Sequence, residues 1–586
     1  MIRGWTGPAI LLDFEFRSES GGNPAIHCLS WKFLGEPGVH EVWLSGERPP
    51  IPEPFSDPNA LFVAYYASAE MNCFLELGWP LPRHVLDLYP EFRVATNGKR
   101  LTIGSERGSS GLLGALAYYD LDPMDAAEKE EMRALARRGA PFSDQERPDL
   151  QAYCNEDVFA LERLLPQMAP GIDLRHALLR GRFMKAAALM ERRGVPIDTA
   201  LLKSLTTHWE TIKLQLIRQV DAQYGIYDGT RFDSARWLEW ARGHHIDWPH
   251  LPSGHPMLDD KTFELAALLH PEVAPMHELR QVQSKLKTLD LPVASDGRHR
   301  TLLSAFGTVT GRNAARKSIF GLPSWLRSLI SPTPGRALAC IDWSQQELGI
   351  AAALSGDAAM SHAYMSGDPY LSFAQQAGAV PPGATKETHP VERERFKACS
   401  LGVLFGLGAK GLAERIRAPR ASGQELLDAH HATYRDFWTW RQAAVDTVFL
   451  HGSMRTTLGW PIHLGTETRP LTLANFPMQA HGAEMMRLAA CLAVESGIEV
   501  CAPIHDAFLI EAADDEIDDA VAEMQRVMAD ASRTVLGGFE LRSDVRIIRH
   551  PDRLLDEKGR GMWNRVAGIL GELEGCPPLL ERAAHA

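Results

Sequence analysis

An apolar segment in the middle of the chain ends in a carboxylate. Residues 337–341 are all apolar, which is typical of a buried strand, and Asp342 follows immediately. Glu347 comes five residues later, where apolar residues concentrated over 348–354 predict a helix. A single aspartate after a strand is as often a turn or helix-cap residue as a functional group, so this segment alone leaves both interpretations open.

A second segment, distant in the sequence, supplies a partner for Asp342. Residues 503–511 predict two short strands that meet at a tight turn, with His505 and Asp506 at its tip. Two aspartates on adjacent sheet positions can hold two Mg²⁺ ions. Two-metal sites of that kind stabilise both the attacking and the leaving oxygen of a phosphoryl transfer, so the pair favours a functional interpretation.

The chain begins with a strand that carries two acids on one face. Residues 9–16 predict a strand, and the period of two places Asp13 and Glu15 on the same side. Two carboxylates on an otherwise apolar strand are costly unless they bind something positive. Further strands are predicted at 25–31, 41–44 and 62–66, and Glu70 stands at the head of a helical stretch.

Tyr153 and Asp157 lie four positions apart in a helical pattern that continues to Leu165, so they share one helix face. Taken alone, such a pair is more often an ordinary surface feature than a site. The acids at the start of the chain make a site the better interpretation. The charged, Pro- and Gly-containing segment 120–148 predicts a loop-and-helix excursion, and 166–171 is the predicted end of the first domain.

The charge of the chain is unevenly distributed. With 586 residues the chain is too long for one core, and three or four domains are expected. The net charge of −13 argues by itself against a nucleic-acid binder, yet no acidic residue occurs from 297 to 341. This stretch predicts a basic strip that follows phosphates, with a solvated basic face as the alternative. Its cations are Arg298, Arg300, Arg312, Arg316, Lys317, Arg327 and Arg336.

The cysteines and the N-terminus bear on the compartment. The eight cysteines are scattered without close pairs, which predicts reduced thiols of a cytoplasmic protein and argues against a disulfide framework or a zinc site. The first residues contain no apolar stretch long enough for a signal peptide or a membrane span. No association with a membrane is therefore expected.

Four separated motifs together resemble one protein family. Asp342 to Leu348 resembles motif A of the family A DNA polymerases, the class that includes bacterial DNA polymerase I, and His505-Asp506 resembles motif C. Each motif alone is weak, but four in the family's order are specific. The other two are Arg393-x-x-x-Lys397-x-x-x-Leu401-Gly402-x-x-Phe405-Gly406, which resembles motif B, and Thr310-Gly311-Arg312. The N-terminal part resembles the family's proofreading domain, so the resemblance covers nearly the whole chain.

The resemblance implies a multidomain α/β fold of the α+β type. It implies an RNase H-like 3′–5′ exonuclease domain over residues 1–170, followed by a right-hand polymerase domain over residues 171–586. Within the polymerase domain we expect the thumb at about 198–300, the palm at about 301–390 and 471–586, and the fingers at about 391–470.

The resemblance also implies roles for the motif residues at the expected polymerase site. Asp342, Asp506 and the backbone carbonyl of Trp343 would hold two Mg²⁺ ions, for which Mn²⁺ may substitute, and Glu347 would exclude the 2′-hydroxyl of a ribonucleotide. Arg393, Lys397, Leu401 and Phe405 would bind the dNTP, with Lys397 donating a proton to the leaving pyrophosphate. Arg312 and Gln479 would contact the minor groove of the new base pair, and His505 the primer end.

Motif B can also be interpreted physically. Its four side chains recur every four residues, so they form one stripe on a predicted helix, with the two cations near the helix's positive N-terminal end. An amphipathic core helix does not explain two cations in line with apolar residues. Three positions depart from the family: Leu401 replaces Phe or Tyr, Phe405 replaces Tyr, and Ala507 replaces an auxiliary Glu.

The N-terminal acids resemble the DEDDy exonuclease set. In that family the acids bind two metals and the tyrosine orients the attacking water, which implies these roles for Asp13, Glu15, Glu70, Asp157 and Tyr153. The third acid is usually Asp, and Glu70 departs from this pattern. Asp87 is the alternative third acid.

The expected partners follow from the resemblance. They are primer–template DNA and dNTPs, with neither a membrane nor thioredoxin, because the thumb has no room for a thioredoxin-binding insertion, and we expect a monomer. The absence of a 5′-nuclease segment makes the layout similar to a phage or plasmid replicative polymerase. The alternatives are a nuclease whose C-terminal part only binds DNA, and a non-catalytic replication factor. Intact Asp342, Asp506, Lys397 and Arg393 argue against both.

Overall fold

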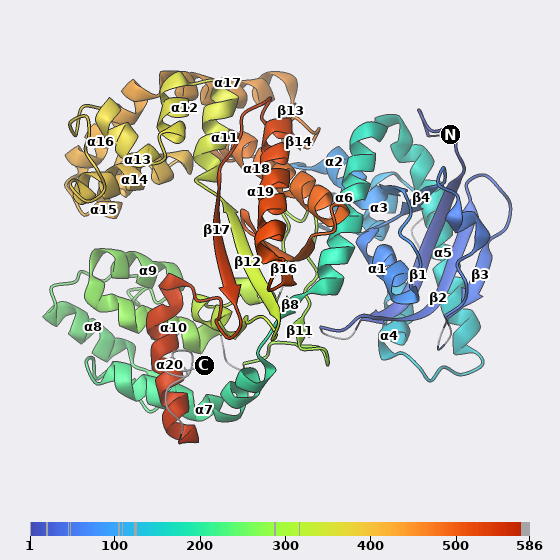
Figure 1. Ribbon diagram of the computed structural model, residues 1–586, viewed down its shortest axis with the longest axis horizontal. Helices are drawn as coiled ribbons and strands as arrows, with labels where there is room; N and C mark the ends of the chain where they lie inside the picture. Colours follow the sequence, from blue (N-terminus) through green and yellow to red (C-terminus); the bar gives the residue numbers. More distant parts are fainter. Residues whose placement is uncertain are drawn as a thin grey trace.

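The fold is taken from a computed structural model that describes residues 2–18, 21–44, 46, 48–103, 106–107, 109–121, 126–285, 289–315 and 317–575. Figure 1 shows a sheet-containing N-terminal unit on one side and a central sheet beside it. Two groups of helices lie on the far side of that central sheet. The predicted mixed α/β multidomain fold is confirmed. The predicted domain limits remain predictions.

The N-terminal unit is built on a mixed five-stranded sheet in the order β3-β2-β1-β4-β5. The central strand β1 is antiparallel to β2 and parallel to β4. The strands are β1 (Ala9–Ser18), β2 (Pro24–Phe33), β3 (His40–Trp43), β4 (Leu61–Ala64) and β5 (His84–Asp87). The strands expected from the apolar pattern of this part are therefore confirmed.

Helices cover both faces and the ends of this sheet. They are α1 (Ser68–Leu77), α2 (Leu88–Thr96), α3 (Leu112–Tyr118), α4 (Ala126–Arg138) and α5 (Glu146–Met168), with a small hairpin of β6 (Thr102–Ile103) and β7 (Glu106–Arg107). α5 packs against β1 and β2, and α4 packs against β1 and α5. The predicted loop-and-helix excursion over 120–148 therefore contains α4.

A long helix, α6 (Leu174–Arg193), connects the N-terminal unit to the rest of the molecule. It contacts β5 on one side and helix α18 (Pro470–Glu495) on the other. Gly181 allows the close approach to β5, because a Cβ at this position would lie 1.9 Å from the Val85 carbonyl oxygen. Arg180 and Glu91 form a buried two-pronged ion pair at 2.6 and 2.8 Å between α6 and α2.

The central sheet is antiparallel and has the order β15-β16-β12-β17. Its strands are β12 (Arg336–Trp343), β15 (Glu499–Ile504), β16 (Ala507–Ala513) and β17 (Ser543–Arg549). β12 runs between β16 and β17, with Asp342 opposite Ala507 on one side and opposite Asp544 on the other. α18 and α19 (Ile517–Val535) pack on this sheet. The predicted strand at 337–341 and the predicted hairpin at 503–511 are thus neighbours.

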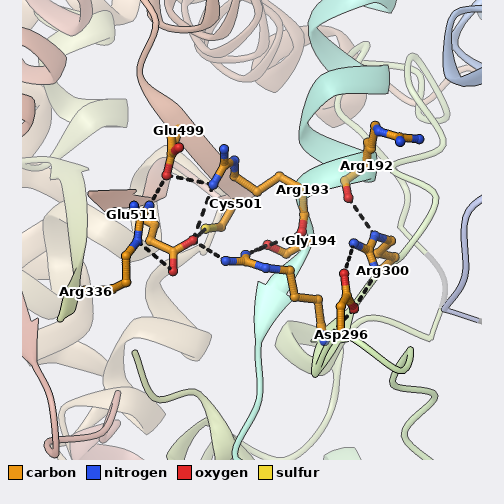
Figure 2. A network of polar contacts seen from close by, with 10 residues as sticks. Arg192, Arg193, Gly194, Asp296, Arg300, Arg336, Glu499, Cys501 and Glu511 are labelled. Carbon is orange, nitrogen blue, oxygen red and sulfur yellow. Dashed lines mark hydrogen bonds and ion pairs between the residues drawn. The ribbon is translucent and has the colours of Figure 1, made fainter. Parts of the chain in front are cut away.

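A network of charges around the buried Glu511 joins this sheet to the connecting helix, as Figure 2 shows. Glu511 on β16 is 1% exposed and receives Arg298, with Arg193 and Arg336 each 3.5 Å away. Glu499 pairs with Arg193 at 2.7 Å and also with Arg336. The Arg298–Glu511 pair is the most buried of these contacts, and removing one partner of a buried pair commonly costs about 3–5 kcal/mol, so this pair fixes β11 (Arg298–His299) against the sheet.

The basic segment 297–341 does not form a free strip of cations. Its side chains Arg298, Arg300, Arg327 and Arg336 pair with Glu511, Asp296, Asp556 and Glu499, respectively. In this structure these four arginines are paired with carboxylates outside the segment, and their contact with phosphates remains a prediction. Lys317 is exposed, and Arg316 lies outside the described residues.

The first group of helices follows the connecting helix. It contains α7 (Thr199–Asp221), α8 (Ser234–Gly243), α9 (Asp260–Leu269) and α10 (Ala274–Lys285), with short strands β8 (Val195–Pro196), β9 (Tyr227–Asp228) and β10 (Arg231–Phe232). The last helix, α20 (Arg560–Glu574), packs against α7 (Figure 1). Trp563 and Leu570 of α20 share an apolar cluster with Trp209 of α7. This C-terminal helix, which we expected to belong to the palm, therefore packs on the predicted thumb.

The second group of helices lies at the opposite end of β12 (Figure 1). It contains α11 (Gln346–Ser355), α12 (Ala358–Met365), α13 (Pro369–Gln376), α14 (Pro390–Leu404), α15 (Ala409–Arg415), α16 (Arg420–Thr433) and α17 (Arg435–His451), then the hairpin β13 (Ser453–Arg455) and β14 (Pro461–His463). Within the described ranges, no helix is both long enough and apolar enough to cross a membrane. The seven described cysteines are free thiols.

Candidate active site

The end of β12 and the start of α11 place the first two candidate acids. β12 delivers Asp342 to the exposed end of the sheet, and the chain then turns sharply at Gln345, whose φ is +47°. This left-handed conformation is strained for a residue other than glycine, and such strain clusters at functional sites. The turn starts α11 at Gln346, which puts Glu347 in the first turn of the helix.

The hairpin between β15 and β16 places the third acid beside the first. Ile504 pairs with Ala507, so His505 and Asp506 form the two-residue turn, with His505 at a φ of +54°. The backbone N–H of Trp343 donates to the carbonyl oxygen of Asp506 at 3.2 Å, which ties the two motifs together. The Trp343 indole is fully buried, so this residue can reach a substrate or metal only through its backbone.

Burial and neighbouring acids raise the pKa of Asp342. Burial raises the pKa of Asp342 to about 7, and the charges of Asp506 and Asp544 add to this effect. Burial also raises the pKa of Asp506, while His505 and Arg312 lower it. Asp544, which was not a candidate from the sequence, stands opposite Asp342 on β17 and accepts a hydrogen bond from the Ser344 hydroxyl at 2.7 Å.

We expect the affinity of this site for Mn²⁺ to fall as the pH drops through about 7, because a proton on Asp342 then competes with the metal. Asp544→Asn removes a negative charge that raises the pKa of Asp342, so the midpoint of this pH dependence should move to lower pH. The titration is made in an Asp13→Ala chain to silence the N-terminal acids. An unchanged midpoint would show that Asp544 does not act on Asp342.

A cavity of about 490 Å³ opens beside these acids. Its lining includes the predicted site residues Arg312, Glu347, Leu401, His505 and Asp506. Burial raises the pKa of Glu347, and the charge of Arg312, which lies 3.3 Å away, offsets part of this rise. Tyr370, which the sequence analysis missed, also lines the cavity. Gln479 is half-buried on α18. It is not among the described residues that line this cavity.

The predicted motif B helix exists as α14, but its stripe is shorter than expected. Arg393, Lys397 and Leu401 lie on α14, whereas Phe405 follows the last helical residue and is 46% exposed. The helix ends there because Gly406 adopts a φ of +84°. Arg393 pairs with Asp368 at 2.5 Å and Lys397 lies 3.6 Å from Glu394, so both cations have carboxylate partners in this conformation.

A second cluster of acids lies in the N-terminal unit. The ligand atoms of Asp13, Glu15 and Asp157 are all within 4.8 Å of one another. β1 supplies Asp13 and Glu15, and α5, packed on β1, supplies Asp157 and Tyr153. Burial and mutual repulsion hold the pKa values of Asp13 and Glu15 well above the usual range, although Lys129 and Arg133 lower that of Asp13.

The structure favours Glu70 over Asp87 as the further acid of this cluster. Glu70, in the first turn of α1, is 3% exposed, and burial together with the charge of Asp13 raises its pKa. A hydrogen bond from the backbone of Phe14 lowers that pKa, which places Glu70 beside β1. Asp87 instead caps α2, accepting the backbone N–H groups of Tyr66, Ala67 and Tyr89 at 2.7–2.9 Å.

The decisive comparison is with protein families. The sequence model of DNA polymerase family A matches residues 253–547, which are 295 of the 586 residues. The chain belongs to DNA polymerase family A. The match includes the segments around Asp342, Arg393 and Asp506.

Relatives of this family A chain are bacterial DNA polymerases I. The chain is 23% identical over 427 residues to DNA polymerase I of Aquifex aeolicus, covering 66% of this chain and 72% of that protein. It is 22% identical to the Chloroflexus aurantiacus enzyme, covering 73% of this chain and 50% of that protein. It is 24% identical to the thermostable Thermus thermophilus enzyme, covering 59% of this chain and 45% of that protein. The chain thus spans about half the length of the latter two.

A solved structure shares the fold of this family A chain. It is the polymerase domain of Pol1 from M. smegmatis in complex with a DNA primer–template and dNTP. The TM-score is 0.71 at 20% identity, and the superposition covers 93% of this chain and 96% of that one. At this identity the likeness shows the fold, and it extends over nearly all of the chain.

Proposed function

We propose that this chain extends a DNA primer by template-directed addition of dNTPs. The observation that carries the proposal is that motifs A and C meet at one end of the central sheet. Asp342 and Asp506 lie there beside a cavity that also contains Arg312 and Glu347, in a chain of DNA polymerase family A. The M. smegmatis polymerase domain of the same fold was solved with a primer–template and dNTP.

The oxygen ligands available at this end of the sheet suit a hard divalent cation. Asp342, Asp506 and the carbonyl of Trp343 offer only oxygen ligands, which Mg²⁺ prefers and Mn²⁺ accepts. The negative charges of Asp506 and Asp544, which raise the pKa of Asp342, are a further sign of fit, since a bound cation offsets them. When bound, two such ions supply stabilisation of the attacking and leaving oxygens of phosphoryl transfer.

The cations of α14 have to exchange partners before they can bind a triphosphate. Arg393 is held by Asp368 and by the face of Tyr370, whose ring centre lies 5.6 Å from the guanidinium. Lys397 is half-exposed beside Glu394. The proposed role of Arg393 and Lys397 is to bind the phosphates of the dNTP after they leave these acids, with Lys397 donating a proton to pyrophosphate. Phe405, exposed at the end of α14, would contact the incoming nucleotide.

Glu347→Ala should relax sugar selection. In the proposed role Glu347, held near Arg312 at the wall of the cavity, leaves no room for a 2′-hydroxyl. Truncation opens that space, so the efficiency of ribonucleotide incorporation relative to dNTP should rise on the order of 10- to 100-fold. Single-nucleotide kinetics with matched rNTP and dNTP measure the ratio. An unchanged ratio would remove Glu347 from this role.

A 3′–5′ exonuclease is the second candidate function, located in the N-terminal unit. The observation that favours it is the convergence of Asp13, Glu15 and Asp157 within 4.8 Å, with Glu70 and Tyr153 beside them. These carboxylates would hold divalent metal at a 3′ end.

The remaining predictions concern the partners and the setting: minor-groove contacts by Arg312 and Gln479, primer contact by His505, a monomer without thioredoxin, and replication of a phage or plasmid genome.

A primer-extension assay tests the proposed functions together. The full chain is incubated with a labelled primer–template and Mg²⁺, with and without four dNTPs. We expect longer products with dNTPs and shortened primers without them. Shortening under both conditions would favour a nuclease with a DNA-binding scaffold, and an unchanged primer under both would favour a non-catalytic DNA-binding factor.

A further inference from the structure

The carboxylate cluster of the N-terminal unit contains a cation of the protein's own. The ammonium of Lys129 donates to Asp157 Oδ1 at 2.5 Å, and the Lys129 side chain is only 2% exposed. The same ammonium lies 5.5 Å from the ring centre of Tyr153, over its face. Lys129 therefore contacts both residues that α5 contributes to the proposed exonuclease site.

The fold holds this ammonium in place. α4, which carries Lys129, packs against β1 and α5. Near its C-terminal end, the His27 ring shares a 3.0 Å hydrogen bond with the carbonyl of Ala136, and Ala136 belongs to an apolar cluster with Tyr153. A lysine is rarely buried without a charged partner, because an unpaired buried ammonium is costly. The contact with Asp157 is therefore part of how α4 docks.

The local charges explain why a cation is needed here. Asp13, Glu15 and Asp157 present ligand atoms within 4.8 Å of one another. Glu70 adds a carboxylate whose buried Oε2 has no hydrogen-bond partner among the described residues. Carboxylates packed this closely repel one another unless cations lie between them. An ammonium bonded to Asp157 Oδ1 offsets one of these negative charges, so a single divalent ion can balance the rest.

We propose that Lys129 takes the place of one of the two divalent ions that the family resemblance implies, so that this site binds one divalent ion. Lys129 bonds to Asp157 Oδ1 and supports the ring of Tyr153, while Asp13 and Glu15 hold the single ion together with Asp157, whose ligand atom lies within 4.8 Å of theirs. This inference deepens the proposed exonuclease function and rests on it. In its effect on the reaction Lys129 is a positioning residue, because it acts through Asp157 and Tyr153.

The same unit contains a matched control pair. Lys32 on β2 is as deeply buried, with 5% of its side chain exposed, and it bonds to Glu162 Oε2 at 2.5 Å. Glu162 is on α5, as Asp157 is, but lies outside the three-carboxylate group. A Lys32→Met chain therefore loses a buried lysine that bonds to a carboxylate of α5 at the same distance, with Glu162 more exposed than Asp157 (30% against 11%), and it does not touch the cluster.

The test counts Mn²⁺ ions by electron paramagnetic resonance in the full chain. Asp342→Asn and Asp506→Asn are present throughout, so that the polymerase acids do not contribute. We expect one Mn²⁺ at saturation in this background, two after Lys129→Met, and one after either Lys129→Arg or Lys32→Met. Two ions in the background, or one after Lys129→Met in a folded chain, would overturn the inference. The background count alone decides if Lys129→Met does not fold.

Digestion of a single-stranded 3′ end by the same chains separates this inference from the function on which it rests. Digestion accompanied by two Mn²⁺ in the background would overturn the inference and leave the exonuclease function standing. Binding of one Mn²⁺ without any digestion would overturn the exonuclease function. The inference that Lys129 replaces one of two divalent ions at a metal site would still stand.

Discussion

Asp342→Ala should lower primer extension by about 1,000-fold or more while the protein stays folded and still binds primer–template. Asp342 lies one residue before the end of β12, at the surface of the sheet beside Asp506, so its removal takes away a proposed metal ligand and leaves no cavity in the core. Metal stabilisation of the reacting oxygens contributes several kcal/mol, and each 1.4 kcal/mol is a factor of about ten in rate. Single-turnover incorporation of one dNTP, with DNA binding measured in parallel, gives the two quantities.

Asp514→Ala is the matched control for this experiment. Asp514 follows the opposite end of β16 and forms an exposed pair with Arg549 at 2.7 Å, so the substitution changes a carboxylate of the same sheet far from Asp506 along the strand. Exposed pairs contribute little to stability, and extension should be unchanged. Extension by Asp342→Ala at a rate near that of the control would contradict the assignment of Asp342 as a metal ligand.

Asp13→Ala should abolish digestion of single-stranded 3′ ends and leave primer extension intact. Asp13 is central to the cluster with Glu15 and Asp157, whereas the polymerase acids lie on a different sheet. We expect the digestion rate to fall by on the order of 1,000-fold, because the cluster loses a ligand and its geometry for metal. Release of labelled nucleotides from a 3′-labelled strand measures digestion, and extension is followed with the same preparation.

Glu156→Ala controls for the loss of a carboxylate from this region, since Glu156 is exposed and precedes Asp157 on α5. It should digest normally. Glu70→Ala should behave as Asp13→Ala does, while Asp87→Ala should chiefly lower the free energy of unfolding, because Asp87 accepts three backbone N–H groups. Normal digestion by Glu70→Ala together with lost digestion by Asp87→Ala would reverse our choice of the further acid.

The sequence was enough to predict the residues that local pattern determines. Asp342 follows an apolar segment of a strand, and Asp506 lies in a two-residue turn between two further strands. The structure contains both features, because strand and turn preferences are local. The same holds for Asp13 and Glu15, which share a face through the period of the strand. The family resemblance then connected segments that pattern alone could not pair.

Features that depend on long-range packing were missed or wrong. Lys129 stands in a charged stretch and gives no pattern that would distinguish it from a surface lysine, and Asp544 became relevant only through the pairing of β17 with β12. Arg298 and Arg336 form part of a basic segment in the sequence, but Glu511 and Glu499 neutralise them from strands distant in the chain. The end of α14 before Phe405 follows from the backbone of Gly406, which periodicity does not report.

The most direct test of the central claim is single-nucleotide incorporation on four primer–templates that differ only in the first templating base. Each is incubated with the full chain, Mg²⁺ and one dNTP at a time, so that sixteen combinations are compared. If Asp342 and Asp506 form a template-directed polymerase site, each template should direct efficient addition of its complementary dNTP, and all addition should disappear with Asp506→Ala. Addition that ignores the templating base, or that persists in Asp506→Ala, would contradict it.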